Sequence, residues 1–164
     1  MICIIRPTPI IRAVALVTMA LFGSGASAEP SIKIGLIMPM TGALASNGKQ
    51  IVAAAKLYMQ QHGDSVAGKK IELIVRDDGT LPDMSKRIAQ ELLTNEKVDI
   101  IGGGITAGMM AIAPLVTETK TPTVVMLSGS SVVTEKSPYI VRTSFTLEQS
   151  SVVLADWAEK KRHR

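Results

Sequence analysis

Cysteine, histidine and aromatic residues are scarce in this chain of 164 residues, and each shortage excludes a class of site. The single cysteine, Cys3, excludes an intrachain disulfide and any zinc or thiol-redox pattern that needs several cysteines. Neither histidine, His62 nor His163, offers a plausible base for a serine, so no nucleophile–base pair can be named. Aromatic residues, 3% of the chain, offer few surfaces on which nucleic-acid bases could stack.

The common enzyme motifs are also absent. The sequence contains no G-x-x-x-x-G-K-[ST] phosphate loop, no H-E-x-x-H and no G-x-S-x-G. Gly102, Gly104 and Gly108 miss the dinucleotide-binding spacing G-x-G-x-x-G by one residue. These absences predict a protein that is not an enzyme and uses no cofactor and no metal. An enzyme on a Rossmann-like domain remains an alternative at this point.

The net charge of +4 comes from the two ends of the chain. Residues 1–28 and 160–164 hold six of the 18 basic residues and no acidic residue. Residues 29–159 therefore hold 12 basic and 14 acidic residues, which is a net charge of −2. A basic surface for nucleic acid is not predicted, because the excess of positive charge comes from the two ends of the chain.

Residues 1–28 have the pattern of a secretory signal peptide. Arg6 and Arg12 supply the positive start, and the apolar run from Ala13 to Phe22 is short for a bilayer span. Ala26-Ser27-Ala28 is a small-residue cleavage site, which predicts export to the periplasm with Glu29 as the first mature residue. A membrane anchor is the alternative reading of the same segment.

The remaining residues, 29–164, alternate between apolar strands and helical patterns. Buried strands are predicted at 32–38, 71–75, 98–101 and 123–127. Helices are predicted from Ser46 or Asn47 as a cap to His62, at 83–95, at 108–118 and from Leu147 onward. His62 is expected to interact with the carboxyl end of the first helix. Helical spacing predicts these buried faces: Ile51, Ala54, Ala55, Tyr58, Met59 and His62 in the first helix, Ile88 and Leu92 in the second, and Met109, Ile112, Ala113 and Val116 in the third. Asp77-Asp78 is interpreted as a polar strand end with a helix cap, with acid–base catalysis or metal binding as the alternatives. This order predicts an α/β fold with a parallel sheet flanked by helices.

Two turns at the ends of predicted strands carry most of the polar groups. The first is the glycine-rich turn at 102–108, and the second is the hydroxyl-rich turn at 128–131. In a parallel sheet both turns lie at the carboxyl edge, where open α/β sheets bind ligands. Thr106 is predicted to cap the following helix or to bind an anion there. Hydroxyls and free backbone amides suit a carboxylate or small polar ligand without catalysis.

An ordered set of short motifs resembles the start of the branched-chain amino-acid-type periplasmic binding proteins. The motifs are Gly35-x-x-x-Pro39-x-Thr41-Gly42 followed by Gly48, then Asp77-Asp78, Ala113-Pro114 and Ser137-Pro138-Tyr139-x-Val141-Arg142-Thr143. Members of this family are the substrate-binding subunits of ABC importers, and the most similar subgroup includes proteins that bind aromatic acids. The resemblance covers about Ile32 to Glu159.

The resemblance implies a ligand site and partners. It implies two α/β lobes that close on a small ligand, an amino acid or a related carboxylate that can be aromatic, and it implies an importer permease as partner. The membrane would be reached only through the transporter. A sensor built on the same fold is the alternative. The implied ligand-binding positions are Asn47, Ile105, Thr106, Ser128, Gly129 and Ser130.

Length is the main departure from the family pattern. Family members are much longer, so residues 29–164 are expected to form only part of the first lobe of a type I periplasmic binding protein. The basic tail from about residue 160 has no apolar face and looks like an unrelated ending. We expect such a truncated lobe to bind ligand weakly, because the second lobe would supply the remaining contacts.

Overall fold

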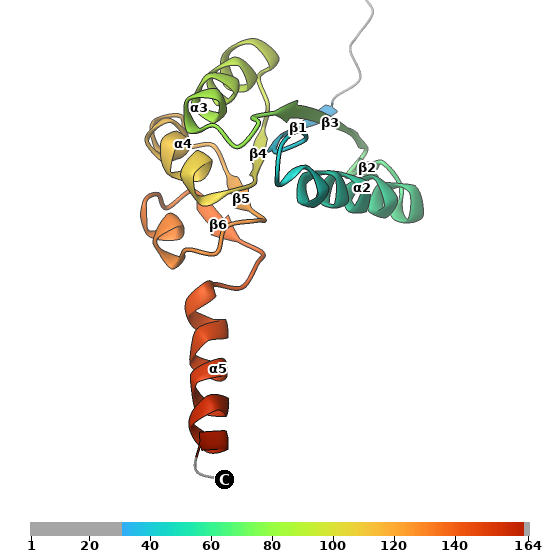
Figure 1. The fold of residues 1–164 in the computed structure, drawn as a ribbon. Helices are drawn as coiled ribbons and strands as arrows, with labels where there is room; N and C mark the ends of the chain where they lie inside the picture. Colours follow the sequence, from blue (N-terminus) through green and yellow to red (C-terminus); the bar gives the residue numbers. More distant parts are fainter. Residues whose placement is uncertain (1–30, 163–164) are drawn as a thin grey trace, which may run out of the picture.

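A six-stranded sheet with helices on both faces forms the body of the protein (Figure 1). The computed structural model describes residues 31–162, so the predicted signal peptide at 1–28 and Cys3 lie outside the described residues. The strands are β1 (Ser31–Met38), β2 (Ser65–Val66), β3 (Lys69–Asp77), β4 (Ile100–Gly103), β5 (Thr123–Val125) and β6 (Ile140–Arg142). The helices are α2 (Ala45–His62), α3 (Pro82–Glu91) with its π-helical end η1 (Leu92–Glu96), α4 (Thr106–Glu118), the 3₁₀ turn η2 (Ser131–Glu135) and α5 (Leu147–Arg162).

The strand order in the sheet is β2-β3-β1-β4-β5-β6. All neighbours are parallel except β2 and β3, which form an antiparallel pair around the turn at Ala67 and Gly68. The predicted α/β fold with a parallel sheet is confirmed, and the four predicted strands are present. The prediction missed β2 and β6, which have two and three residues.

Two apolar layers pack against opposite faces of the sheet. Along β1, Leu36 and Met38 point toward α2, and Ile37 between them points toward α3 and α4. Successive side chains of a strand point to opposite faces, so a strand buried on both faces reads as one continuous apolar run. Figure 1 shows α2 on one side of the sheet and α3 and α4 together on the other.

The helices facing the larger layer follow the predicted pattern. In α4, Met109, Ile112, Ala113 and Val116 are all buried, as predicted. The predicted helix at 83–95 is α3 continued by η1, and its Ile88 and Leu92 are buried.

Helix α2 differs from the prediction. Its buried residues are Gly48 and Val52, and Tyr58 of the predicted apolar stripe is exposed. Within residues 31–162, α2 is the only helix on this face of the sheet, so fewer of its positions are buried. His62 does interact with the end of this helix, because its Nδ1 lies 3.1 Å from the carbonyl oxygen of Tyr58.

The helix-cap interpretation of the aspartate pair is wrong. Leu81 precedes the first residue of α3, and no side chain caps that helix. The buried Asp78 accepts hydrogen bonds from the hydroxyl of Ser85 at 2.7 Å and from the amide of Thr80 at 3.1 Å. Asp77 is the last residue of β3, as the polar strand end predicted.

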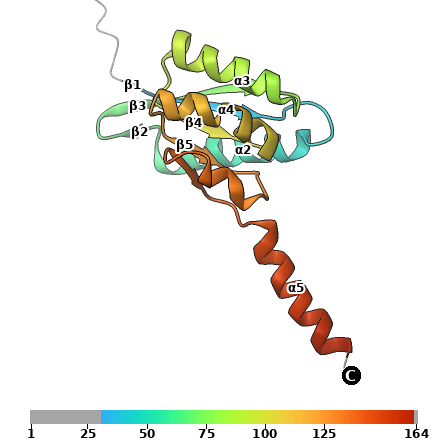
Figure 2. The ribbon, with the colours of Figure 1, turned by 90° about the vertical axis from the view of Figure 1, so that its left-hand side faces the viewer.

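Helix α5 extends away from the sheet (Figures 1 and 2). It begins at Leu147, as predicted, and none of its residues is buried. Trp157 is 59% exposed. Within residues 31–162, the helices are too short or too polar to cross a bilayer.

Candidate functional site

The order in which the chain adds strands to the sheet reverses beside β1. From β1 the chain crosses to β3 on one side, and from β3 it returns to β4 on the other side of β1. The loops that follow β1 and β4 therefore diverge to opposite faces, toward α2 and α4. Open α/β sheets bind ligands in the crevice at such a switch point. The loop before α2 and the turn before α4 lie on either side of this switch point.

The two turns singled out in the sequence meet directly at this edge. The hydroxyl of Thr106, after β4, lies 2.8 Å from the hydroxyl of Ser128, after β5. Ser128 is 2% exposed and Thr106 is half-buried, so the hydroxyl pair at the carboxyl edge is largely shielded from solvent. The predicted capping role of Thr106 is wrong: the helix begins at Thr106 itself, Ile105 precedes it, and no side chain caps the helix. The hydroxyl is engaged across the sheet instead.

Arg142 from β6 is hydrogen-bonded to the second turn. The sequence-based prediction did not include it among the site residues. Its guanidinium donates to the backbone carbonyl oxygens of Ser128 and Ser130, one from each terminal nitrogen. Ser144 also donates its hydroxyl to the carbonyl of Ser128, at 3.4 Å. Within residues 31–162, no carboxylate pairs with Arg142. The only signal in the sequence was its place in the motif Val141-Arg142-Thr143.

Three more predicted positions belong to the same cluster. Ile105 is half-buried and adjoins Thr106, and Gly129 and Ser130 follow Ser128 in the turn that Arg142 holds. The carbonyl of Gly129 accepts the amide of Leu147 at 2.8 Å, which connects the turn to the start of α5. The structure therefore brings together five of the six predicted residues in one cluster.

Asn47, the sixth predicted residue, lies apart from this cluster. It is exposed in the first turn of α2, and within the described residues no hydrogen bond joins it to the other five. The predicted cap at Ser46 or Asn47 is wrong, since Leu44 precedes the helix and no side chain caps it. Gly48 is packed against the backbone of Pro39, so the start of α2 lies directly against the end of β1.

Two carboxylates near the edge are held by neutral donors. Hydrogen bonds lower the pKa of the Asp77 carboxyl below its usual value, and the bond from the hydroxyl of Thr41 has the largest effect. The backbone amide of Glu148 and the hydroxyl of Ser131, which donates to Glu148 at 2.9 Å, lower the pKa of Glu148. Over residues 31–162, no group of three histidine, cysteine, aspartate or glutamate side chains is arranged to hold a metal ion.

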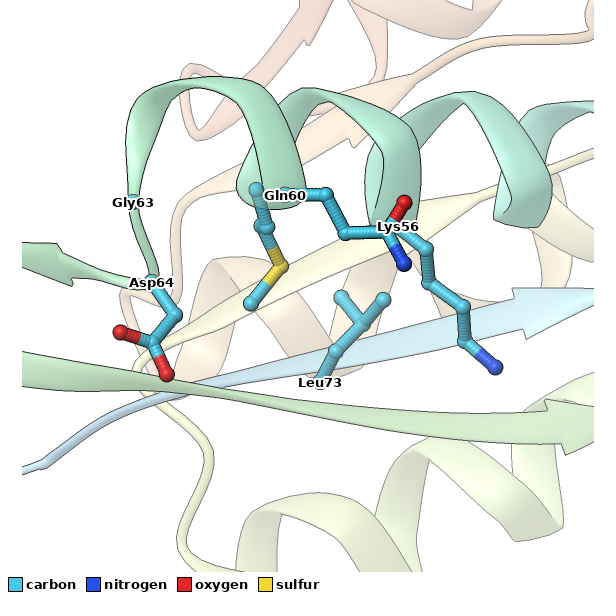
Figure 3. Close-up of a pocket in the computed structure, with 6 residues that line it drawn as sticks. Lys56, Gln60, Gly63, Asp64 and Leu73 are labelled. Atoms are coloured by element: carbon cyan, nitrogen blue, oxygen red, sulfur yellow. The ribbon is translucent and has the colours of Figure 1, made fainter.

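A hollow of about 500 Å³ lies away from this edge, between α2 and β3 (Figure 3). It lies near the C-terminal end of α2, and Figure 3 shows Lys56 and Gln60 of that helix above Leu73 of β3. None of the predicted site residues lines it. The hydroxyl cluster at the carboxyl edge, where two turns and a cation converge, is therefore the candidate ligand site.

Comparison with known proteins assigns the family. Residues 31–164 match the family described as periplasmic binding protein. The chain belongs to the periplasmic binding protein family. A Leu/Ile/Val-binding protein homolog of Brucella abortus (strain 2308) is 38% identical to it over 148 residues. That match covers 88% of this chain and 38% of the Brucella protein. The resemblance stated from the sequence is thereby confirmed.

Solved structures of ABC transporter solute-binding proteins share the fold of this family member. One, from Rhodopseudomonas palustris BisB5 in complex with 3,4-dihydroxybenzoic acid, is 59% identical with a TM-score of 0.79. Another, from Rhodopseudomonas palustris HaA2 in complex with p-hydroxybenzoic acid, is 44% identical with a TM-score of 0.77. Both matches cover 80% of this chain and 36% of the other, so the chain spans little more than a third of their length.

Proposed function

We propose that this protein is the solute-binding part of an ABC importer for small aromatic carboxylates of the hydroxybenzoate kind. The observation that carries the proposal is the hydroxyl pair of Thr106 and Ser128 at the switch-point edge, with the cation of Arg142 behind it. A hydrogen bond from a neutral hydroxyl to a carboxylate contributes about 1.5–3 kcal/mol, and a nearby positive charge favours an anion over a neutral ligand.

We prefer an aromatic carboxylate to an aliphatic amino acid as the ligand because of the comparisons with solved relatives. The solved relatives that are 59% and 44% identical hold hydroxybenzoates, whereas the relative named for leucine, isoleucine and valine is 38% identical. In this proposal Ile105, Thr106, Ser128, Gly129 and Ser130 hold the carboxylate, and Asn47 contacts the ligand from the opposite side of the crevice. The protein binds and releases its ligand without chemistry and delivers it to a permease.

Titration of isotope-labelled protein by NMR tests this function. We expect 3,4-dihydroxybenzoate and 4-hydroxybenzoate to shift the amide signals of residues 104–108 and 128–131, with leucine as the comparison ligand. One lobe supplies about half of the contacts, so a ligand of micromolar affinity in a complete protein retains about 4 kcal/mol here, a dissociation constant near 1 mM. Shifts confined to the hollow beside Lys56 and Leu73, or equal shifts with leucine, would contradict the proposal.

Export to the periplasm is the second part of this proposal. Residues 1–28 carry the signal-peptide pattern, and a solute-binding subunit of an importer works outside the inner membrane. We expect cleavage after Ala28, and mass spectrometry of the periplasmic fraction should find Glu29 at the amino terminus. As a control, Ala28→Pro should block processing. Periplasmic protein that retains Met1 would contradict this prediction.

A further inference from the structure

One exposed carboxylate at the end of β3 holds the loop between β1 and α2. Asp77 accepts hydrogen bonds from the amide of Met40 at 2.8 Å, the amide of Thr41 at 3.4 Å, the hydroxyl of Thr41 at 2.7 Å and the amide of Gly79 at 2.9 Å. We propose that Asp77 is a positioning residue, which fixes this loop and so places Asn47 at the ligand edge. The inference rests on the proposed function, because it assigns Asn47 to the ligand site.

A continuous series of contacts leads from the carboxylate to the ligand edge. The held residues, Met40 and Thr41, continue into a tight turn in which the amide of Ala45 donates to the carbonyl of Gly42 at 3.2 Å. The first turn of α2 follows, and Gly48 packs it against Pro39. Every link is short and local, so a displacement of Thr41 would be transmitted to the start of the helix.

The neighbouring charges show that this carboxylate serves the loop and not the core. Arg76 turns away and pairs with Glu91 and Glu96, with N–O distances of 3.6 and 3.1 Å. Asp78 is buried and bonded to Ser85, which makes it the aspartate that supports the packing of α3. Residues 39–48, which form the loop and the first turn of α2, contain no ionisable side chain. Within residues 31–162, neutral donors alone hold Asp77.

Hydrogen exchange of the whole chain measures the proposed role. Asp77→Ala should speed amide exchange at Met40 and Thr41 by about tenfold, equivalent to about 1.4 kcal/mol, while amides of β4 keep their protection. Asp83→Ala is the matched control, because Asp83 is an exposed aspartate of α3 whose carboxylate makes no hydrogen bond within residues 31–162. Unchanged exchange in the loop of Asp77→Ala would overturn the inference.

Substitutions of Thr41 separate the hydrogen bond from changes of shape. Thr41→Val keeps the volume and removes the donor, so loop exchange should rise; Thr41→Ser keeps the donor and should retain protection.

An acid titration of the Asp77 carboxylate gives an independent measurement. The amide signal of Met40 should move with a midpoint below 3.8, the ordinary pKa of an aspartate, because the bonds favour the charged form. A midpoint at or above 3.8 would mean that the carboxylate is not held.

Ligand titration then distinguishes this inference from the proposed function. With 3,4-dihydroxybenzoate as the probe, Asp77→Ala should bind about fivefold more weakly than the unmodified chain, equivalent to about 1 kcal/mol. Faster loop exchange with unchanged affinity would overturn the link to the ligand site. If the unmodified chain binds no hydroxybenzoate, the proposed function and the assignment of Asn47 fail together, whereas unchanged loop exchange overturns the Asp77 inference alone.

Discussion

Replacing Gly48 by alanine should destabilise the protein by about 2–3 kcal/mol. In most helices this change is favourable by about 1 kcal/mol, because glycine has more backbone freedom to lose on folding. Here a Cβ atom would overlap the carbonyl oxygen of Pro39 and lie 2.9 Å from its carbonyl carbon. Both groups are backbone, so neither can rotate away, and the start of α2 must move off the end of β1. The clash therefore reverses the sign expected from helix propensity.

Chemical denaturation of the two proteins measures this difference. Ala53→Gly is the matched control, since Ala53 is an exposed position of the same helix and should lose only about 1 kcal/mol on replacement by glycine. Gly48→Ala should also alter the NMR signals of the loop that leads to Asn47. A Gly48→Ala protein that is more stable than the unmodified chain would show that α2 does not pack on Pro39 as described.

Replacing Thr106 by valine should weaken hydroxybenzoate binding by roughly 10- to 100-fold, equivalent to about 1.5–3 kcal/mol. The change keeps the shape of the side chain and removes the hydroxyl that we assign to the ligand carboxylate. It also takes from the buried Ser128 its hydroxyl partner at 2.8 Å. Thr106→Ser keeps the hydroxyl and should stay within a few-fold of the original affinity.

The affinity is best measured in a chimera that completes the site. Residues 31–162 would replace the matching part of the 59% identical Rhodopseudomonas palustris protein, and 3,4-dihydroxybenzoate would be titrated by calorimetry. Thr117→Val is the matched control: Thr117 lies on the same helix and donates to another buried serine, Ser137, at 2.7 Å. It should lower stability without changing affinity. Equal losses of affinity from Thr106→Val and Thr117→Val would mean that Thr106 acts only through folding.

Polar groups at the carboxyl edge of the sheet are hydrogen-bonded to one another. Thr106 and Ser128 join the turns after β4 and β5, and Arg142 joins the second of these turns to β6. Two carbonyl oxygens point at the guanidinium, which leaves hydroxyls and amides of the same turns for a ligand. A half-buried cation without a carboxylate partner in the described chain favours an anionic ligand nearby. The proposed preference for a carboxylate rests on this arrangement.

Sequence patterns predicted four of the six strands and the four longer helices of the fold. Continuous apolar runs such as 32–38 predicted buried parallel strands, and the spacing of Met109, Ile112, Ala113 and Val116 predicted the buried face of α4. These signals are local, because burial of a strand or helix face requires apolar residues at a fixed period. The family was also predicted from the ordered motifs, and the comparisons confirm it.

The partners of the polar side chains were decided only by the tertiary structure. Thr106 was predicted to cap a helix or to bind an anion; it caps no helix, and its hydroxyl is hydrogen-bonded to Ser128, 22 residues away. Asp77 is hydrogen-bonded to Thr41, 36 residues away. A hydroxyl or carboxylate has several partners of similar energy, and the sequence pattern does not rank them. Strand order decides which partners meet, because placing β1 between β3 and β4 brings the ends of distant segments to one edge. Local spacing contains no information on that order, so the sequence could indicate candidate residues but not their hydrogen bonds.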